Sequence, residues 1–293
     1  MSDHASTITS VPAFGLIVVG DEILSGKRAD KHMSKLIELL SARGLSLAWS
    51  EYVGDVPERI TFTLSRAFAS GGVVFCTGGI GATPDDHTRQ CAAAALKRPL
   101  VLHPEAKALI EQRMQEIAQQ QGQTYQPDHP DHVHRLNMGV FPEDARIIPN
   151  PYNKIPGFSC TVGSWVAGQG APAAPPQATT VHFVPGFPVM AWPMMEWVLD
   201  TYYGALFHQY AQAERSVIVF GAMEAALTPL MLAVERSHPA VRVFSLPSVD
   251  HPSYGRHIEL GVKGPAAAVA CAYADLRAGL IAAGAHLGPE LGA

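Results

Sequence analysis

The stretch Val73-Val-Phe-Cys-Thr-Gly-Gly-Ile-Gly-Ala-Thr-Pro-Asp-Asp-His-Thr88 decides the fold. Its first residues, Val73–Cys76, are all apolar, which is typical of a strand buried on both faces of a parallel sheet. A glycine-rich turn follows, and then an alanine-rich helix that we expect to extend to about Arg98. A buried strand that leads through a turn into a helix is the repeating unit of a doubly wound α/β fold.

The same order occurs before and after this stretch. Phe14–Gly20 is a second continuous apolar run, and apolar residues at helical spacing follow between Asp30 and Arg43. Val181–Val184 predicts a further strand, again with a helix behind it. Strands that alternate with helices at this spacing predict an α/β domain over residues 14–208, with a three-layer, doubly wound, mostly parallel sheet.

Changes in composition divide the rest of the chain. Residues 1–13 read as a flexible arm, and the alanine-, proline- and glycine-rich segment 167–180 as a mobile loop. Residues 215–293 predict a small α+β domain, in the order strand, helix, strand, strand, helix.

Composition excludes several classes of protein. Apolar residues make up 47% of the chain, which is enough for a packed core. The net charge is -5, and the sequence has no block of basic residues such as a nucleic-acid binder or a membrane anchor would carry. No apolar run approaches the ~18 residues of a spanning helix. Residues 1–14 lack the features of a signal peptide. We expect a cytoplasmic protein that binds neither nucleic acid nor membrane, and whose four cysteines are buried thiols.

The glycine-rich turn has the pattern of a phosphate site. Its glycines leave the backbone uncluttered at the end of a strand, and Thr83 can cap the next helix with Pro84 and Asp86 at its first and third positions. The N-terminus of such a helix suits a phosphate group. We therefore predict ligand or phosphate binding by a set of residues within this segment: Thr77, Gly78, Gly79, Gly81, Thr83 and Thr88.

Two carboxylates in the same segment point to a metal ion. Asp85 and Asp86 would repel a phosphate unless a divalent cation lay between them, so the pattern predicts a cradle for phosphate and Mg²⁺. An alternative stays open, in which the segment is a tight turn and Asp86 only completes a capping box.

Gly20-Asp21-Glu22 is the second candidate segment. Its carboxylates follow a buried strand and can hold a metal ion or a hydroxyl group of a ligand, and Asp21 is a third candidate metal ligand beside Asp85 and Asp86. The alternative is a surface turn whose acidic side chains face water.

Two further segments carry weaker signals. Pro185 and Gly186 follow a predicted strand, where a glycine lets the backbone approach a ligand, although a rigid turn explains them equally well. His129, His132 and His134 lie among aspartates and suggest a metal site, but a solvated loop or the start of a helix is the favoured reading.

Taken in order, these motifs resemble a known family. Gly20-Asp-Glu-Ile-Leu-Ser-Gly26, Thr77-Gly-Gly-Ile-Gly81, Asp85-Asp-His-Thr88, Phe141-Pro-Glu-Asp-Ala-Arg-Ile-Ile-Pro-Asn-Pro151 and Val184-Pro-Gly-Phe-Pro188 are similar to motifs of the molybdopterin-binding (MoaB/MogA-type) domain. The form is that of competence/damage-inducible protein CinA, and the match covers roughly residues 14–207. The tail from about Ser216 resembles the small middle domain of CinA. We expect the further nicotinamide-mononucleotide deamidase domain of CinA to be absent, because the sequence ends at Ala293.

The resemblance implies a ligand and two possible activities. In MogA-type members the glycine-rich segment binds molybdopterin and Mg²⁺, and Asp86 and Thr88 match its motif, whereas Ile80 and Asp85 depart from it. In CinA-type members the domain is associated with metal-dependent hydrolysis of nucleotide diphosphates such as ADP-ribose or FAD. The first hypothesis is therefore that Asp86 and Asp85 act with a divalent cation, Mg²⁺, Mn²⁺ or Co²⁺, to cleave a pyrophosphate bond of a bound pterin or dinucleotide.

Two alternatives remain. One is molybdopterin binding with adenylyl transfer in molybdenum cofactor biosynthesis, and the other is a non-catalytic ligand-binding scaffold. The family resemblance further implies a homo-oligomer, either a dimer or a trimer.

Overall fold

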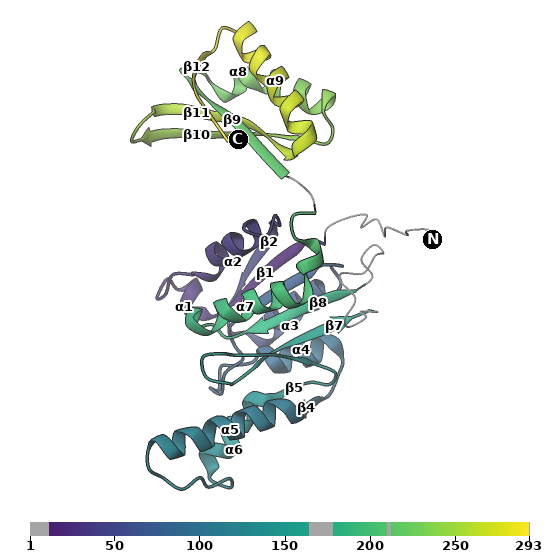
Figure 1. Cartoon of the computed structure of the whole chain (residues 1–293), viewed down its shortest axis with the longest axis vertical. Helices are drawn as coiled ribbons and strands as arrows, with labels where there is room; N and C mark the ends of the chain where they lie inside the picture. The colour runs from purple at the N-terminus through teal and green to yellow at the C-terminus, as the bar shows by residue number, and fades with distance from the viewer. Residues whose placement is uncertain (1–11, 164–177, 210–211, 293) are drawn as a thin grey trace, which may run out of the picture. The chain divides into compact units, whose positions relative to one another are not determined.

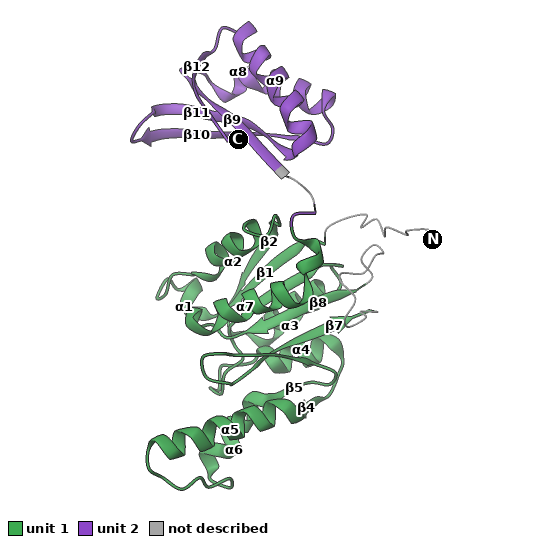
Figure 2. Ribbon diagram, viewed as in Figure 1, with its two compact units in different colours: residues 1–207 green, residues 208–293 purple. Residues whose placement is uncertain are grey.

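The computed structural model describes residues 12–163, 178–209 and 212–292. The chain forms two compact units, Met1–Phe207 and His208–Ala293, which are coloured separately in Figure 2. The predicted arm at 1–13 and the predicted loop at 167–180 lie almost entirely outside the described residues.

The first unit is built on a six-stranded sheet in the order β2-β1-β3-β8-β7-β6. The four strands β2, β1, β3 and β8 are parallel, and β7 and β6 continue the sheet antiparallel. Their bounds are β1 Phe14–Val19, β2 Leu47–Val53, β3 Val73–Thr77, β6 Arg146–Ile148, β7 Gly157–Val162 and β8 Thr179–Val184. The predicted α/β fold with a mostly parallel sheet is confirmed.

Helices cover both faces of this sheet, which makes three layers (Figure 1). The alternating side chains of β1 explain why its sequence is apolar throughout. Leu16 and Val18 pack in the cluster that includes the side chains of α2 and α7, while Ile17 and Val19 pack in the opposite cluster with α3 and α4. The helix bounds are α2 His32–Ser41, α3 Pro57–Phe68, α4 Thr88–Leu96 and α7 Pro188–Tyr202.

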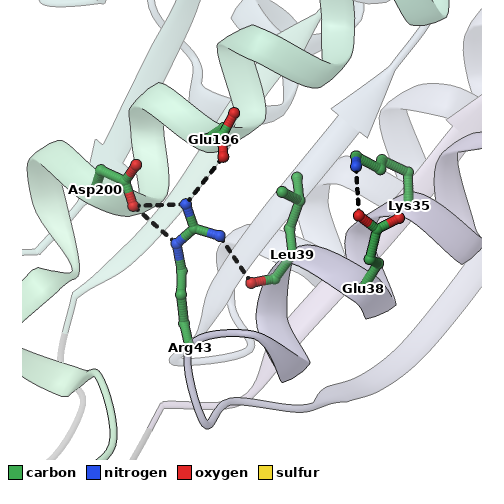
Figure 3. Close-up of polar contacts among 6 residues, drawn as sticks. All are labelled: Lys35, Glu38, Leu39, Arg43, Glu196 and Asp200. Carbon is green, nitrogen blue, oxygen red and sulfur yellow. Dashed lines mark hydrogen bonds and ion pairs between the residues drawn. The ribbon is translucent and has the colours of Figure 1, made fainter.

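Arg43 ties α2 to α7 on the first of these faces (Figure 3). Its Nε donates to Asp200 Oδ1 at 2.8 Å, and a terminal nitrogen lies 3.4 Å from Glu196. Another of its nitrogens donates to the carbonyl oxygen of Leu39 at 3.0 Å, which satisfies the C-terminal end of α2. The arginine thereby joins two helices that are far apart in the sequence.

Between β3 and β6 the chain makes an excursion beyond the sheet (Figure 1). Two short antiparallel strands pair Leu100 with Pro142, and the helical segments between them end near the cavity described below. The bounds are β4 Leu100–Leu102, α5 Pro104–Gln120, α6 Pro130–Leu136, η1 Asn137–Gly139 and β5 Val140–Pro142; the remaining short helices of this unit are α1 Asp21–Leu24 and η2 Gly204–Leu206.

The second unit has an antiparallel sheet in the order β10-β11-β9-β12. Helices α8 and α9 pack on it, and Val217, Leu260 and Leu276 lie in the shared core. The bounds are β9 Gln212–Phe220, α8 Glu224–Ser237, β10 Arg242–His251, β11 Gly255–Pro265, α9 Ala266–Ala282 and β12 His286–Leu291. The final strand was missing from the predicted order, because Gly288 and Pro289 give it little resemblance to a strand.

Two other sequence-based expectations meet the structure here. No helix in the described part of the chain is long and apolar enough to cross a membrane. Cys76, Cys91 and Cys160 are buried as expected, but Cys271 is exposed on α9.

A buried polar chain crosses the interior of the first unit. His182 Nδ1 lies 2.8 Å from Ser159 Oγ, and its Nε2 lies 2.7 Å from the hydroxyl of Tyr203. Burial, together with the positive charge of Arg146, lowers the pKa of His182 to about 3. An unfolded histidine has a pKa near ~6.5. The folded state therefore holds this imidazole neutral at a pH where the unfolded chain already binds a proton.

We expect this histidine to make the first unit sensitive to mild acid. Its contribution to stability is complete above about pH 6.5 and is lost as the pH falls toward 3, so lowering the pH from 7 to 5 removes about 2 kcal/mol. Thermal denaturation of the wild type and of His182→Asn at both pH values measures the effect. The Tm of His182→Asn should fall less between pH 7 and pH 5 than the Tm of the wild type. His134→Asn, at an exposed position, should show the same fall as the wild type. Equal losses in all three proteins would contradict the prediction.

Candidate functional site

A cavity of about 690 Å³ lies at the carboxyl ends of the parallel strands. Gly20 and Glu22 reach it from the end of β1, the segment 78–82 from the end of β3, and Pro185 and Gly186 from the end of β8. Because β1, β3 and β8 are neighbours and parallel, their carboxyl ends meet at one edge of the sheet. The structure therefore brings together three segments that the sequence suggested separately.

Two glycines shape the floor of this cavity. Gly78 has φ +93° and Gly79 has φ +66°, a region that L side chains rarely adopt. A Cβ atom on Gly78 would collide with the carbonyl oxygen of Val19, and one on Gly79 would collide with Thr88 Oγ1. The Gly78 N–H donates to the carbonyl oxygen of Val184 at 3.1 Å, so the turn is fastened between β1 and β8.

The next residues present unused hydrogen-bond donors. Within the described part of the chain, no acceptor is bonded to the backbone N–H groups of Gly79, Ile80, Gly81 or Ala82. All four residues line the cavity. Consecutive N–H groups in a glycine-rich turn form a concave site for an anion such as phosphate.

The predicted helix cap at Thr83 is wrong. Helix α4 begins at Thr88, after His87, and residues 83–86 form a separate turn in which the Asp86 N–H donates to the Thr83 carbonyl at 3.0 Å. One half of the predicted capping box is present in this turn, because Asp86 Oδ2 accepts from the Thr83 N–H at 2.8 Å and also from its hydroxyl at 2.5 Å. Pro84 followed by Asp85 favours a β-turn at this point over the first turn of a helix.

Not all the predicted ligand-binding residues reach the cavity. Thr83, Asp85 and Asp86 line it, but Thr77 and Thr88 are buried behind the glycine-rich turn. Their hydroxyl groups have no hydrogen-bond partner among the described residues. They pack against the turn and do not line the cavity.

Asp21 does not line the cavity itself, but its hydrogen-bond partner Asp55 does. Asp21 Oδ1 accepts from the Asp55 N–H at 3.2 Å, and the Asp21 N–H donates to Asp55 Oδ2 at 2.8 Å. Asp55 lines the cavity, and Asp21 is not among the lining residues of the described chain. The sequence held a signal for it, because Val53-Gly-Asp55 repeats Val19-Gly-Asp21 at the end of a neighbouring strand.

The carboxylates at the cavity influence one another. Burial raises the pKa of Asp55, and the negative charges of Asp21, Glu22 and Asp85 raise it further. No three His, Cys, Asp or Glu side chains in the described residues are grouped so as to hold a metal ion by themselves. This holds for the histidine-rich segment too, where His129 begins helix α6 and accepts from the Asp131 N–H at 3.3 Å.

Cationic and apolar groups complete the cavity wall. Lys27 and Arg28 line it, and the Arg28 guanidinium lies 5.8 Å from the centre of the Phe187 ring. The sequence did not predict Arg28, Asn150 or Asn153 as site residues. Asn150 and Asn153 belong to a loop that lies more than a hundred residues after Arg28 in the sequence. Asn150 organises that loop by donating to Asn153 Oδ1 at 2.8 Å and to the Ile155 carbonyl at 2.9 Å. The remaining apolar lining residues include Met138, Ile155, Pro156 and Met190.

A family model described as "Probable molybdopterin binding domain" matches residues 15–205. The chain belongs to the molybdopterin-binding domain family. The matched range contains all three strand ends that meet at the cavity.

Relatives of this molybdopterin-binding domain include CinA-like proteins. One from Gloeobacter violaceus is 33% identical over 147 residues, which make up 50% of this chain and 32% of the relative, so the chain spans about a third of that protein. A protein of Pyrobaculum calidifontis is 29% identical over 255 residues and aligns with 85% of this chain and 87% of its own length. The structure of a CinA protein of unknown function from Thermoplasma acidophilum shares the fold, with a TM-score of 0.50 and 24% identity over 65% of this chain and 97% of its own.

Proposed function

We propose that the cavity binds a phosphate-bearing compound with a flat ring, a pterin or a dinucleotide, and that the protein hydrolyses a nucleotide pyrophosphate bond of the ADP-ribose or FAD type. One observation carries this proposal: the free N–H groups of residues 79–82 and the carboxylates of Glu22, Asp55, Asp85 and Asp86 face the same cavity. Donors for phosphate oxygens beside carboxylates are the surroundings that a metal-bound diphosphate requires.

The donor set fits a divalent cation such as Mg²⁺, Mn²⁺ or Co²⁺. Carboxylate oxygens suit Mg²⁺ and Mn²⁺, and Mg²⁺ usually takes one or two carboxylates together with substrate phosphates, so a complete protein cage is not needed. Burial raises the pKa of Asp55 most, and repulsion from the neighbouring carboxylates, which a cation would relieve, raises it further. In this proposal Asp85 and Asp86 hold the cation, which supplies Lewis-acid polarisation of a phosphoryl oxygen.

The other groups of the chain bind and orient the substrate. The N–H groups of residues 79–82 donate hydrogen bonds to the phosphoryl oxygens, and Lys27 and Arg28 balance their negative charge. A flat ring fits beside the Arg28–Phe187 pair, where it finds both an aromatic face and a guanidinium plane. Asp55 is the proposed proton acceptor for the attacking water, because burial and the neighbouring carboxylates raise its pKa and so make it a better base than an ordinary aspartate.

A second candidate function has the family match in its favour. A molybdopterin-binding domain that handles the pterin by adenylyl transfer would use the same phosphate donors and the same ring site. It predicts tight binding of pterin and little hydrolysis.

An assay of AMP release from ADP-ribose, FAD and NAD, with Mg²⁺, Mn²⁺ or Co²⁺ in turn, separates these functions. The proposal expects turnover of at least one substrate that disappears when EDTA is added. Binding of pterin without turnover would replace it with the second candidate. If neither nucleotide with cation nor pterin raises the Tm, both are excluded and a non-catalytic scaffold remains, because a ligand that binds only the folded state must stabilise it.

A further inference from the structure

A second cavity, of about 320 Å³, lies on the other side of the turn at residues 83–86. Ala82, Thr83 and Asp86 line both cavities, so the turn separates them. The second cavity has its own polar lining, which the first does not share: His87, Arg89, Gln90 and Asn137.

The N-terminus of helix α4 opens into this second cavity. No side chain caps the helix at His87, and its first turn contains no acidic residue. Among the described residues, the N–H groups of Arg89 and Gln90 have no hydrogen-bond acceptor, whereas those of Thr88 and Cys91 are bonded to Gly79 and His87. The positive end of the helix dipole and two free donors therefore face the same space.

Arg89 supplies a second, independent observation at this cavity. It is only 5% exposed, and two of its nitrogens donate to the carbonyl oxygens of Gly81 and Asn137. Its Nε has no partner, and no carboxylate of the described residues lies within the 4.0 Å of an ion pair with it. A buried charge without a counter-ion is costly, and burial accordingly lowers the pKa of this guanidinium.

Asp86 compensates the charge of Arg89 only in part, because its negative charge favours the charged guanidinium but makes no ion pair with it within 4.0 Å. It is the acidic residue among those that line the second cavity, and its Oδ2 is bonded to the N–H and hydroxyl of Thr83. Beside this carboxylate, the cavity has two positive groups, the Arg89 guanidinium and the N-terminal end of α4.

We propose that this second cavity binds a phosphate group, held by Arg89, by the N–H groups of Arg89 and Gln90, and by the side chain of Gln90. A tetrahedral oxyanion matches donors that converge from a helix end and a planar guanidinium. The phosphate is either free inorganic phosphate or the phosphoryl group of a nucleotide. This site is separate from the glycine-rich turn and does not depend on hydrolysis.

The test is calorimetric titration of the intact protein with inorganic phosphate, without nucleotide or divalent cation. We expect saturable binding to the wild type, and binding to Gln90→Glu that is weaker by roughly tenfold or more, because the new charge faces the anion. A glutamate in the first turn of a helix stabilises it, so the Tm should not fall. Arg89→Gln should also lose binding, while Gln115→Glu, the same charge change at an exposed position on α5, should not.

The remaining arms decide the location and the source of the phosphate. Lys27 lines only the first cavity, so phosphate binding that is lost in Lys27→Ala but kept in Gln90→Glu and Arg89→Gln would place the anion in that cavity instead. Displacement of phosphate by AMP would identify the nucleotide phosphoryl group as the occupant, and its absence would identify free phosphate; either supports the site. The proposal is overturned if the wild type binds no phosphate, if Gln90→Glu binds it normally, or if Lys27→Ala alone loses it.

Discussion

Replacing Asp86 with asparagine is expected to reduce metal-dependent hydrolysis by at least about 100-fold, the scale of a lost charge-stabilising group at a phosphoryl centre. Asparagine keeps an oxygen that can accept from the Thr83 N–H and hydroxyl, so the turn at residues 83–86 should persist. It removes the negative charge that the proposal gives to the cation. Initial rates of AMP release at saturating metal, with the Tm measured on the same samples, separate loss of chemistry from loss of fold.

Asp131→Asn is the matched control. This substitution removes one negative charge, as Asp86→Asn does, but on α6, where the Asp131 side chain is 76% exposed and does not line the cavity. Its rate should equal that of the wild type. Full activity of Asp86→Asn would remove Asp86 from the proposed site and leave the assignment of the cation without support. Asp86→Ala is a less clean test, because it also deletes the acceptor that Thr83 uses.

The second large effect concerns Gly78→Ala, which should destabilise the first unit by about 3 kcal/mol. The estimate combines about 1–2 kcal/mol for a side chain at positive φ with about 1–3 kcal/mol for overpacking. Gly78 has φ +93°, and the added methyl group meets the carbonyl oxygen of Val19, which belongs to a buried strand and cannot move aside. Thermal denaturation should show a Tm lower by roughly 6–12 °C.

Gly26→Ala isolates the contribution of the collision. Gly26 has φ +72°, yet no heavy atom lies within 4 Å of the position of an added Cβ. The free energy of unfolding of Gly26→Ala should fall by about 1 kcal/mol, from the backbone strain alone. If Gly78→Ala and Gly26→Ala were equally stable, the contact between the glycine-rich turn and β1 would not explain the glycine at position 78.

The parts of the fold that the sequence predicted well are those with a local cause. β1 and β3 are buried at every position because helices cover both faces of the sheet, and their almost continuous apolar residues make this visible in the sequence. The glycines at 78 and 79 were recognised for the same reason, since a backbone at positive φ leaves its trace in the residue type.

The parts that were missed depend on contacts between distant segments. Asn150 lies within a motif of the family resemblance and Arg28 follows another, but only the folded chain brings their loops to the cavity. Asp55 had a local signal, but its role depends on the reciprocal bonds with Asp21 across two strand ends. The helix cap failed because Thr83 and Asp86 can form either a cap or a turn, and Pro84 with Asp85 selects the turn.

The turn at residues 83–86 separates the two cavities and contributes residues to both. Asp86 lines both cavities, and its bonds to Thr83 fix the turn for whatever lies on either side. Thermodynamic linkage applies to two binding sites that share residues in this way. If a ligand in one cavity changes the affinity of the other cavity for its ligand by some factor, the second ligand changes the affinity for the first by the same factor. If an anion beside Arg89 and a substrate at the glycine-rich turn affect each other's binding, the residues shared by both cavities, Ala82, Thr83 and Asp86, give the shortest route for that effect.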